Sequence, residues 1–385
     1  MEQNERKRKI SLWRILLTIV LSVPAVLFTA AVLQWGLFNL GVPGSTGQTG
    51  GANLAIMDKY DMYMTNKISS ALEGVLSIEK VYWLNDDDKI APEPNQNNFH
   101  KTTNPADLEG FLLEAKELLG VEDTLFSTET KLYSGSEITY YLDETIMTIT
   151  WKELIDGTVY TLSEVKIAHP SQFRRFLADG VYGSDKQYQT TQMAATVNAV
   201  TASSGDFYKF RPYGIRVYDR QVMHVNSAVD TCFITEDGDL LFSYRMEIND
   251  MESAQKFVDE NNIRFSVSFG PVLVDNYECI PVSSHYPLGE VEGYYPRAAI
   301  AKKGELHYLM VAANQDPDRG YERVPTMAAF GKQMQAFGAE KAYALDGGQT
   351  AVIVTNDELI NRPSYGYQRL ISDIIYFATA VPDGG

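Results

Sequence analysis

The chain has 385 residues, of which 45% are hydrophobic, so it can form a sizeable core and is not expected to be disordered. Its formal net charge is −17, and this acidity argues against nucleic acid as a partner. Five His and two Cys provide no His/Cys zinc pattern. The composition assigns no cofactor, and Ca²⁺ at a carboxylate cluster is the metal that it leaves possible.

Residues 1–40 are expected to form a cytoplasmic basic head and a transmembrane signal anchor. Five basic residues lie within the first 14 positions, and an uncharged apolar run follows from Ile15 to Phe38. This run of about 24 residues can cross the bilayer as a helix. The basic head should remain inside the cell, which predicts a single-pass protein of the cell membrane with its C-terminal domain outside. A cleaved signal peptide is the alternative, but the run is longer than the apolar region of a usual signal peptide.

Residues 41–53 are rich in Gly, Ser and Thr and are expected to be a flexible linker. Residues 54–136 are expected to be an accessory α/β region, with a strand over 75–84 and a helix that begins at Asn104 and ends at Gly120. The acidic run over 85–88 does not have the spacing of an EF-hand loop, and we interpret it as a solvated turn.

Residues 137–385 are expected to be an α+β domain with mixed β-sheets flanked by helices. Alternating polar and apolar residues predict a hairpin of strands over 138–142 and 145–151. Further strands are expected over 158–167, 200–203, 215–218, 229–235, 240–244, 264–274, 306–313, 341–345, 351–355, 358–360 and 371–377. Helices are expected near 171–177 and 190–199, and over 251–262 and 326–337.

Two expected strands end at an Asp beside glycine. The first block is Ser204-Gly205-Asp206-Phe207-Tyr208, and the second is Leu345-Asp346-Gly347-Gly348. Glycine lets a ligand approach the backbone closely, and open amides in such a turn can bind an anion. Taken alone, each block is typical of a β-turn in which the Asp caps its own backbone.

Three further blocks carry polar residues within or beside expected strands. They are Ser266–Val274 with its Ser-Phe-Gly-Pro sequence, Pro296-Arg297-Ala298, and Arg369-Leu370-Ile371-Ser372-Asp373 after Asn361-Arg362-Pro363-Ser364. An arginine can hold a phosphate through two parallel hydrogen bonds, although an isolated surface arginine more often pairs with an acidic residue.

Together, in this order, the blocks between Ser163 and Phe377 resemble the phosphodiester glycosidase family. That family includes the lysosomal "uncovering" enzyme, which removes N-acetylglucosamine from a sugar-phosphate diester, and many exported bacterial proteins. The resemblance implies an active site at the ends of several strands and hydrolysis of a sugar-1-phosphate diester at the anomeric carbon. It implies that Asp206 and Asp346 are the catalytic carboxylates. It further implies substrate or phosphate contacts from Arg297, Gly347, Gly348, Ser268, Arg369 and Asp373. Gln349 and Asn314, which differ from the family pattern, are also expected to contact the substrate.

Three positions depart from the family pattern. Ser204 replaces an Asn, Gln349 replaces a third Gly, and Asn314-Gln315-Asp316 stands where many relatives have Asp-Gly-Arg. These departures favour a different substrate or a weakened enzyme.

The sequence as a whole predicts a membrane-anchored extracellular hydrolase that acts on glycosyl phosphodiesters of cell-wall polymers or exopolysaccharide. Two alternatives remain open. One is a non-catalytic carbohydrate-binding protein on the same fold, and the other is a structural envelope protein in which residues 54–136 dock a partner.

Overall fold

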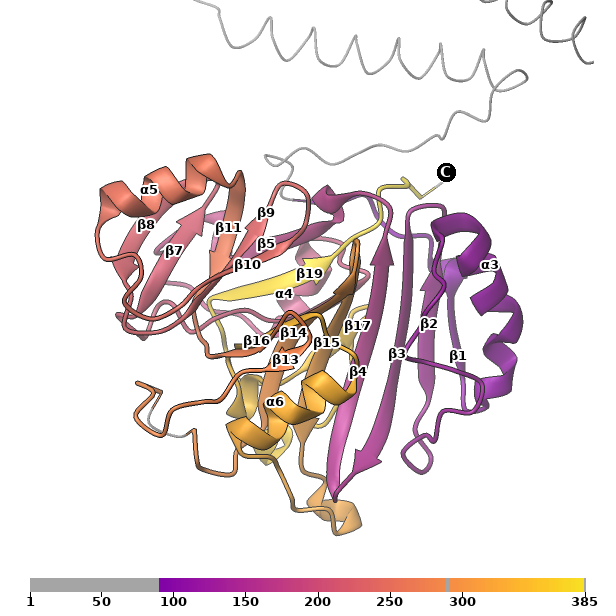
Figure 1. Cartoon of the computed structure of the whole chain (residues 1–385). Helices are drawn as coiled ribbons and strands as arrows, with labels where there is room; N and C mark the ends of the chain where they lie inside the picture. The colour runs from indigo at the N-terminus through magenta and orange to yellow at the C-terminus, as the bar shows by residue number, and fades with distance from the viewer. Residues whose placement is uncertain (1–89, 289–290, 384–385) are drawn as a thin grey trace, which may run out of the picture. The chain divides into compact units, whose positions relative to one another are not determined.

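The computed structural model describes residues 90–288 and 291–383, which contain nineteen strands in four sheets and four α-helices (Figure 1). The predicted α+β class is confirmed, and every strand pair among the described residues is antiparallel. The expected anchor, linker, strand over 75–84 and acidic turn over 85–88 lie outside the described residues. Within the described ranges, no helix has the length and apolarity needed to span a membrane.

A nine-stranded sheet forms the centre of the fold, in the order β1-β2-β3-β4-β15-β14-β16-β12-β13. Its strands are β1 (Phe99–Thr102), β2 (Ile138–Leu142), β3 (Ile146–Ile155), β4 (Thr158–Ile167), β12 (Val272–Asp275), β13 (Glu278–Cys279), β14 (Arg297–Gly304), β15 (His307–Asn314) and β16 (Lys341–Leu345). Both faces of the nine-stranded sheet are buried at β15, because successive side chains of a strand point to opposite faces. Leu309 and Val311 pack in the hydrophobic core on one face, and Met310 and Ala312 pack in the core on the other face.

Helices cover one face of the nine-stranded sheet. Helix α3 (Glu109–Leu119) packs on β3, and α6 (Met327–Ala336) packs on β12, β13 and β14 (Figure 1). The buried side chains of α6 are those of the predicted apolar stripe, including Met327, Phe330 and Met334. The Thr326 hydroxyl caps the first turn of α6 by accepting from the amide of Ala329.

A five-stranded sheet packs on the other face, in the order β18-β17-β6-β19-β5. Its strands are β5 (Phe173–Leu177), β6 (Thr201–Ser204), β17 (Ile353–Thr355), β18 (Glu358–Leu359) and β19 (Asp373–Phe377). Helix α4 (Thr190–Thr196) covers the outer face of this sheet, where Met193 and Ala194 pack with Ala202 and Ile374.

Two smaller sheets complete the described unit. They consist of β10 (Leu240–Ser243), β9 (Thr231–Thr235) and β11 (Ile263–Val267), and of β7 (Gly214–Tyr218) with β8 (Gln221–Asn226). Helix α5 (Met251–Glu260) packs against β8 and β11, and Asp250 caps it by accepting from the amide of Ser253. The strand β8 was not expected from the sequence.

The helix expected near residues 171–177 is wrong. A single 3₁₀ turn, η3 (Pro170–Gln172), is followed by the edge strand β5, which pairs with β19 over its whole length. The pairing places Phe173 opposite Phe377, where the two rings stack with centroids 4.6 Å apart. This long-range contact outweighs the local helical spacing of Phe173, Phe176 and Leu177.

The segment expected to be accessory contributes to the central sheet. Strand β1 pairs with β2 from Phe99↔Tyr141 to Thr102↔Ile138, and α3 packs on β3. The expected domain boundary between residues 136 and 137 therefore lies between β1 and β2, which are hydrogen-bonded strands of one sheet. Both strands belong to one compact unit of the described residues.

Candidate active site

Four polar residues meet at one end of the two packed sheets. Asp206 follows β6 and Asp346 follows β16, while Asp373 begins β19 and Arg297 begins β14. The amide of Asp346 donates to the carbonyl of Gly205 at 3.2 Å, and the Ser204 hydroxyl donates to the carbonyl of Asp346 at 3.2 Å. These two bonds join the end of a strand from the five-stranded sheet to the end of a strand from the nine-stranded sheet.

Arg175 of β5 holds two of the carboxylates. Its Nε and Nη2 lie 3.0 and 2.9 Å from Oδ2 of Asp373, and its Nη2 lies 3.1 Å from Oδ1 of Asp206. Nη1 donates to the carbonyl of Ser266. All three charged side chains are at least 97% buried, and they form a compact cluster with one negative charge in excess when both carboxyls are ionised.

The electrostatics of this cluster are set by burial and by charge. Burial alone would lower the pKa of Arg175, but Asp206 and Asp373 raise it, so the guanidinium stays charged. Burial raises the pKa of Asp373, against the opposing effect of Arg175. Asp373 also accepts from the amide of Asp206 at 3.1 Å, so it fixes the backbone that carries the first predicted catalytic carboxylate.

The carboxylate of Asp206 is saturated with hydrogen bonds. Oδ1 accepts from Arg175 Nη2 and from the amide of Tyr208 at 2.9 Å. Oδ2 accepts from the amide of Ser268 at 2.8 Å and from the Ser268 hydroxyl at 3.2 Å. These four donors use the four lone-pair positions of a carboxylate, so the side chain of Asp206 is held in one orientation.

Asp346 has a different environment. Its side chain is buried, and burial raises its pKa to about 6, with a smaller contribution from the negative charge of Asp206. The Thr350 hydroxyl and the guanidiniums of Arg369 and Arg211 act in the opposite direction. A carboxyl with this pKa changes its protonation near neutral pH, as a proton-transfer group should.

Two arginines and one amide near Asp346 carry unused hydrogen-bond donors. Arg211 lies over the ring of Phe269, 4.8 Å from its centre, and its buried Nη1 has no hydrogen-bond partner among the described residues. The same is true of the buried Nε2 of Gln349. Arg369 is exposed and lies 4.7 Å over the ring of Phe207. An anion between these groups would receive donors that the folded chain leaves unsatisfied.

The turn after Asp346 is fixed by a close backbone contact. The amide of Gly348 donates to the carbonyl of Pro296 at 2.8 Å, so this amide holds the turn. A Cβ on Gly347 would lie 2.6 Å from the same carbonyl, which explains the glycine there. Arg297 begins the adjacent strand, donates to the carbonyl of Gly293 at 2.8 Å and stacks on Tyr295.

The remaining predicted contact residue, Asn314, is part of an internal network. Its Nδ2 donates to the carbonyl of Ala351 at 3.1 Å, and its Oδ1 accepts from Asn361 at 2.8 Å. Asn361 in turn accepts from the amide of Ile353. Asn314 is 2% exposed, so this network fixes the chain that follows Gln349.

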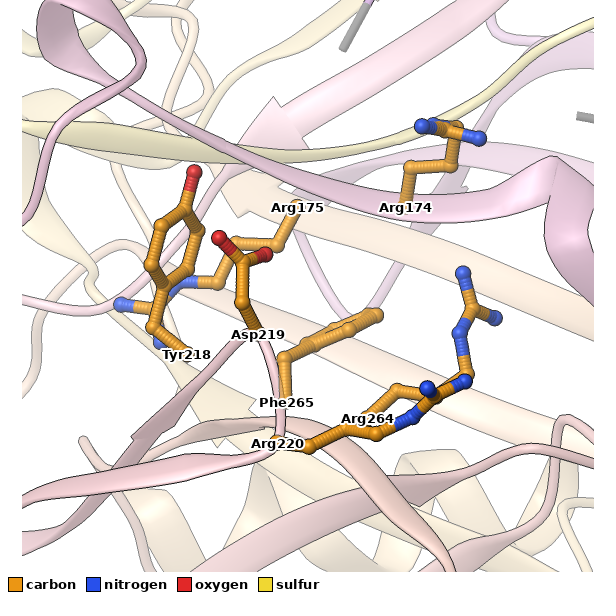
Figure 2. Close-up of a pocket in the computed structure, with 7 residues that line it drawn as sticks. All are labelled: Arg174, Arg175, Tyr218, Asp219, Arg220, Arg264 and Phe265. Atoms are coloured by element: carbon orange, nitrogen blue, oxygen red, sulfur yellow. The ribbon is translucent and has the colours of Figure 1, made fainter. Parts of the chain in front are cut away.

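A separate cavity of about 90 Å³ lies on another side of Arg175. Figure 2 shows its lining around the ring of Phe265: Arg174, Arg175, Tyr218, Asp219, Arg220 and Arg264. It shares only Arg175 with the cluster described above and includes neither predicted catalytic Asp. The convergence at the strand ends, rather than this small cavity, defines the candidate active site.

The described residues contain no group of three or more His, Cys, Asp or Glu side chains that could hold a metal ion.

Arg175 and Arg211 are the two residues of the candidate active site that the sequence did not single out. The pair Arg174-Arg175 inside the apolar sequence Phe-Arg-Arg-Phe-Leu was a usable signal for buried charge, and Arg211 lies in the same loop as Asp206.

Fold and site together define an α+β protein with buried carboxylates and arginines gathered at strand ends. Residues 194–378 match the model of the phosphodiester glycosidase family. This segment of the chain therefore belongs to the phosphodiester glycosidase family, as the sequence blocks indicated. No curated protein matches the chain.

The chain is similar to three solved structures. The first is the catalytic domain of zebrafish N-acetylglucosamine-1-phosphodiester alpha-N-acetylglucosaminidase, auto-inhibited by its pro-peptide, with 15% identity, a TM-score of 0.49, and coverage of 68% of this chain and 92% of that chain. The second, a Synechocystis protein, has 12% identity, a TM-score of 0.44, and coverage of 65% and 64%. The third, a Burkholderia pseudomallei protein, has 11% identity, a TM-score of 0.37, and coverage of 57% and 74%.

Proposed function

We propose that the protein hydrolyses glycosyl phosphodiesters and releases the sugar from a phosphomonoester. The observation that carries this proposal is the environment of Asp346. A buried carboxyl with a pKa of about 6 lies within the electrostatic reach of the guanidiniums of Arg211 and Arg369. A site that combines a proton acceptor with cationic donors suits a substrate with a sugar on one side and a phosphate on the other.

In the proposed reaction, a water molecule attacks the anomeric carbon and gives a proton to the carboxylate of Asp346. The bond between that carbon and the phosphate oxygen breaks, and both electrons stay on the departing phosphomonoester. A phosphomonoester leaves readily and needs little protonation, so cationic stabilisation by Arg211 and Arg369 is the main assistance. Gln349 would add a neutral donor, and the Arg297 guanidinium remains a candidate for a second phosphate oxygen.

Asp206 takes a positioning role in this scheme. Its four hydrogen bonds leave no lone pair for a proton from water. Burial raises the pKa of Asp346, and the negative charge of Asp206 adds a smaller increase, so Asp346 is a stronger base near neutral pH. Direct attack by water predicts inversion at the anomeric carbon, whereas a covalent Asp346 intermediate would give retention.

The surroundings of the reaction also belong to this proposal. Residues 1–40 would anchor the chain in the cell membrane with the domain outside, where cell-wall polymers or exopolysaccharide would supply the substrate. The basic head and the uncharged run from Ile15 to Phe38 support this placement. A requirement for Ca²⁺ would be tested by measuring the rate of the reaction with and without the ion.

A non-catalytic carbohydrate-binding protein is the second candidate. It is supported by Asn314, whose amide group is committed to Asn361 and Ala351, and by the saturated carboxylate of Asp206. The Asn314 amide and the Asp206 carboxylate are both candidates for substrate contacts, but each is already hydrogen-bonded to other residues of the folded chain.

The decisive experiment uses the full-length protein purified in detergent. Release of free sugar would be measured from UDP-N-acetylglucosamine and from a nitrophenyl N-acetylglucosamine phosphodiester, with and without Ca²⁺. We expect release by the unmodified chain, none above background with Asp346→Asn, and normal release with Asp357→Asn, a control in the β17–β18 turn. Proton NMR of the first product would report its anomeric configuration.

Two results would overturn the proposal. The first is a folded protein that releases no sugar from a panel of such diesters. The second is Asp346→Asn with unchanged activity. Retention of configuration would instead keep the hydrolase and make Asp346 the nucleophile.

A further inference from the structure

The small cavity beside Arg175 is lined mainly by arginine (Figure 2). Four arginines and one aspartate are the charged residues of its lining, which therefore has a formal charge of +3 when all five side chains are ionised. The chain as a whole has a formal net charge of −17. A concentration of positive charge inside an acidic protein is a local feature that attracts small anions.

Three elements that are distant in sequence bring these arginines together. Arg174 and Arg175 come from β5, which is the edge strand of its sheet. Arg220 lies in the β7–β8 turn, and Arg264 lies in β11. The amide of Arg220 donates to the carbonyl of Arg264 at 3.0 Å, which fixes the turn on β11. The cavity therefore lies between the edge of a sheet and a turn that is held in place.

Two arginines of the lining also serve other groups. Arg175 holds Asp206 and Asp373 on the side of the candidate active site. Arg220 pairs with Glu236 at 2.8 Å, and both of these side chains are about half exposed. These contacts direct part of the positive charge of Arg175 and Arg220 away from the cavity.

Arg174 and Arg264 are the buried cations of the lining, with exposed fractions of 5% and 7%. One short turn, η3, binds both of them. Arg264 Nη1 donates to the carbonyl of Pro170 at 2.9 Å, and Arg174 Nη1 donates to the carbonyl of Ser171 at 3.3 Å. Adjacent carbonyls thus hold two guanidiniums in the same place, where like charges repel more strongly than in water. An anion between the two guanidiniums would offset this repulsion.

The acidic residue of the lining lies on a different side of the cavity. In the view of Figure 2, the guanidiniums of Arg174 and Arg264 lie on one side of the Phe265 ring. The carboxylate of Asp219 lies on the other side of this ring, toward Arg175. The negative charge of the lining is thus placed away from the two buried arginines.

We propose that this cavity binds one small tetrahedral oxyanion, inorganic phosphate or sulfate, at a site separate from the candidate active site. A guanidinium matches two oxygens of such an ion, and guanidiniums from different strands meet oxygens that point in different directions. A cavity of about 90 Å³ holds more than one water, which needs about 10–15 Å³. It lies well below the roughly 300 Å³ at which pockets for larger ligands begin.

A bound oxyanion would connect two strands that support the candidate active site. It would bridge Arg174 on β5 to Arg264 on β11. The same two strands are joined by Arg175, whose Nη1 donates to the carbonyl of Ser266 and whose charge holds the carboxylate cluster. The ion would therefore stabilise the part of the fold that carries this cluster. The melting temperature should rise with the concentration of the ion, because the ion binds the folded chain and not the unfolded one.

The test measures phosphate binding by calorimetry with the full-length protein in detergent, at constant ionic strength. The Arg211→Met variant is the starting protein, because this change weakens the phosphate contacts proposed for the candidate active site. We expect it to bind one phosphate per chain. Adding Arg264→Gln or Arg220→Gln should weaken that binding about tenfold, since each removes a charge-assisted contact. Arg220 is about half exposed, so Arg220→Gln decides the question if Arg264→Gln does not fold.

Arg362→Gln provides a matched control for Arg220→Gln. Arg362 is also a surface arginine paired with a carboxylate, that of Asp318, and it does not line the cavity. Adding Arg362→Gln to Arg211→Met should leave phosphate binding unchanged. Equal weakening by Arg362→Gln and Arg220→Gln would show a general effect of surface charge and would overturn the proposal.

Two other ligands test the size of the site. Sulfate should bind Arg211→Met with an affinity similar to that of phosphate, whereas phenyl phosphate should not bind, because its ring is larger than the cavity. Phosphate should also raise the melting temperature of Arg211→Met, and by less when Arg220→Gln is added. The proposal is overturned if Arg211→Met binds no phosphate, or if it binds phenyl phosphate as tightly as phosphate. These measurements involve no cleavage, so their outcome is independent of the proposed hydrolase activity.

Discussion

Arg175 and Asp373 form a two-point ion pair between adjacent strands at the end of the five-stranded sheet, with Nε and Nη2 at 3.0 and 2.9 Å from one carboxylate oxygen. Arg175 is paired with Ile375 in the β5–β19 register, so its side chain lies diagonally across from Asp373 on the same face. The pair connects the edge strand to the backbone of Asp206, and it explains why a charged residue occupies a buried position of β5.

Replacement of Arg175 by Met should destabilise the protein by about 3–5 kcal/mol, because Asp206 and Asp373 would remain buried without their cation. Urea unfolding followed by far-UV circular dichroism would measure the change. The double variant Arg175→Met, Asp373→Asn should recover part of the loss, since it removes one unpaired charge. Absence of any recovery would contradict the charge explanation.

Gly205→Ala should disrupt the site, because an added Cβ would lie 1.9 Å from Oδ2 of Asp373. Gly205 stands opposite Asp373, to whose carbonyl its amide donates at 3.1 Å. We expect a lower melting temperature and lost activity. Gly304→Ala, at the end of β14, is the matched control, since its Cβ would meet no atom within 4 Å. Equal melting temperatures for the two variants would contradict this prediction.

The stability of the protein should depend on pH through Asp346. Its pKa is about 6 in the folded chain against a reference of 3.8, so between these values the folded state binds more protons than the unfolded chain. Stability therefore falls as pH rises through this window, by about 3 kcal/mol in total. The Asp346→Asn variant should not show this decrease in stability, because its side chain does not ionise. The difference in unfolding free energy between the variant and the unmodified protein should grow from pH 4 to pH 7.

Catalytic activity should also depend on the ionisation of Asp346, but it should increase over the pH range in which stability decreases. As a general base, Asp346 must be ionised, so kcat/KM should rise with pH through about 6 and then reach a plateau. The pH profile of the nitrophenyl diester reaction would check this. A kcat/KM that falls through the same range would assign Asp346 the role of an acid.

Arg211 should contribute to phosphate recognition through its unused Nη1. Arg211→Met should lower kcat/KM by about 10²-fold and weaken competitive inhibition by inorganic phosphate, since a charge-assisted contact is lost. Arg362→Met is the control, because Arg362 pairs with Asp318 on the surface. Phosphate inhibition that is unchanged in Arg211→Met would place the anion elsewhere, with Arg297 as the next residue to replace.

Much of the fold could be predicted from the sequence, because most of its elements have a strong local pattern. The hairpin of β2 and β3, the strands β4, β15 and β16, and the helices α5 and α6 all lie where alternation or helical spacing predicts them. The edge strand β5 was mispredicted, since its pentapeptide contains two charged residues and its conformation depends on pairing with β19.

The sequence by itself determined the family blocks, the Asp residues at two strand ends and the glycines beside them, because short-range chemistry is enough to recognise a strand followed by a flexible turn. Only the tertiary structure decided how the two carboxylates differ. Asp206 is saturated by donors from Arg175, Tyr208 and Ser268, whereas burial leaves Asp346 with a pKa of about 6. Arg175 lies 31 residues before Asp206 and Ser268 lies 62 residues after it, so these hydrogen bonds, like the desolvation of Asp346, depend on how distant parts of the chain pack.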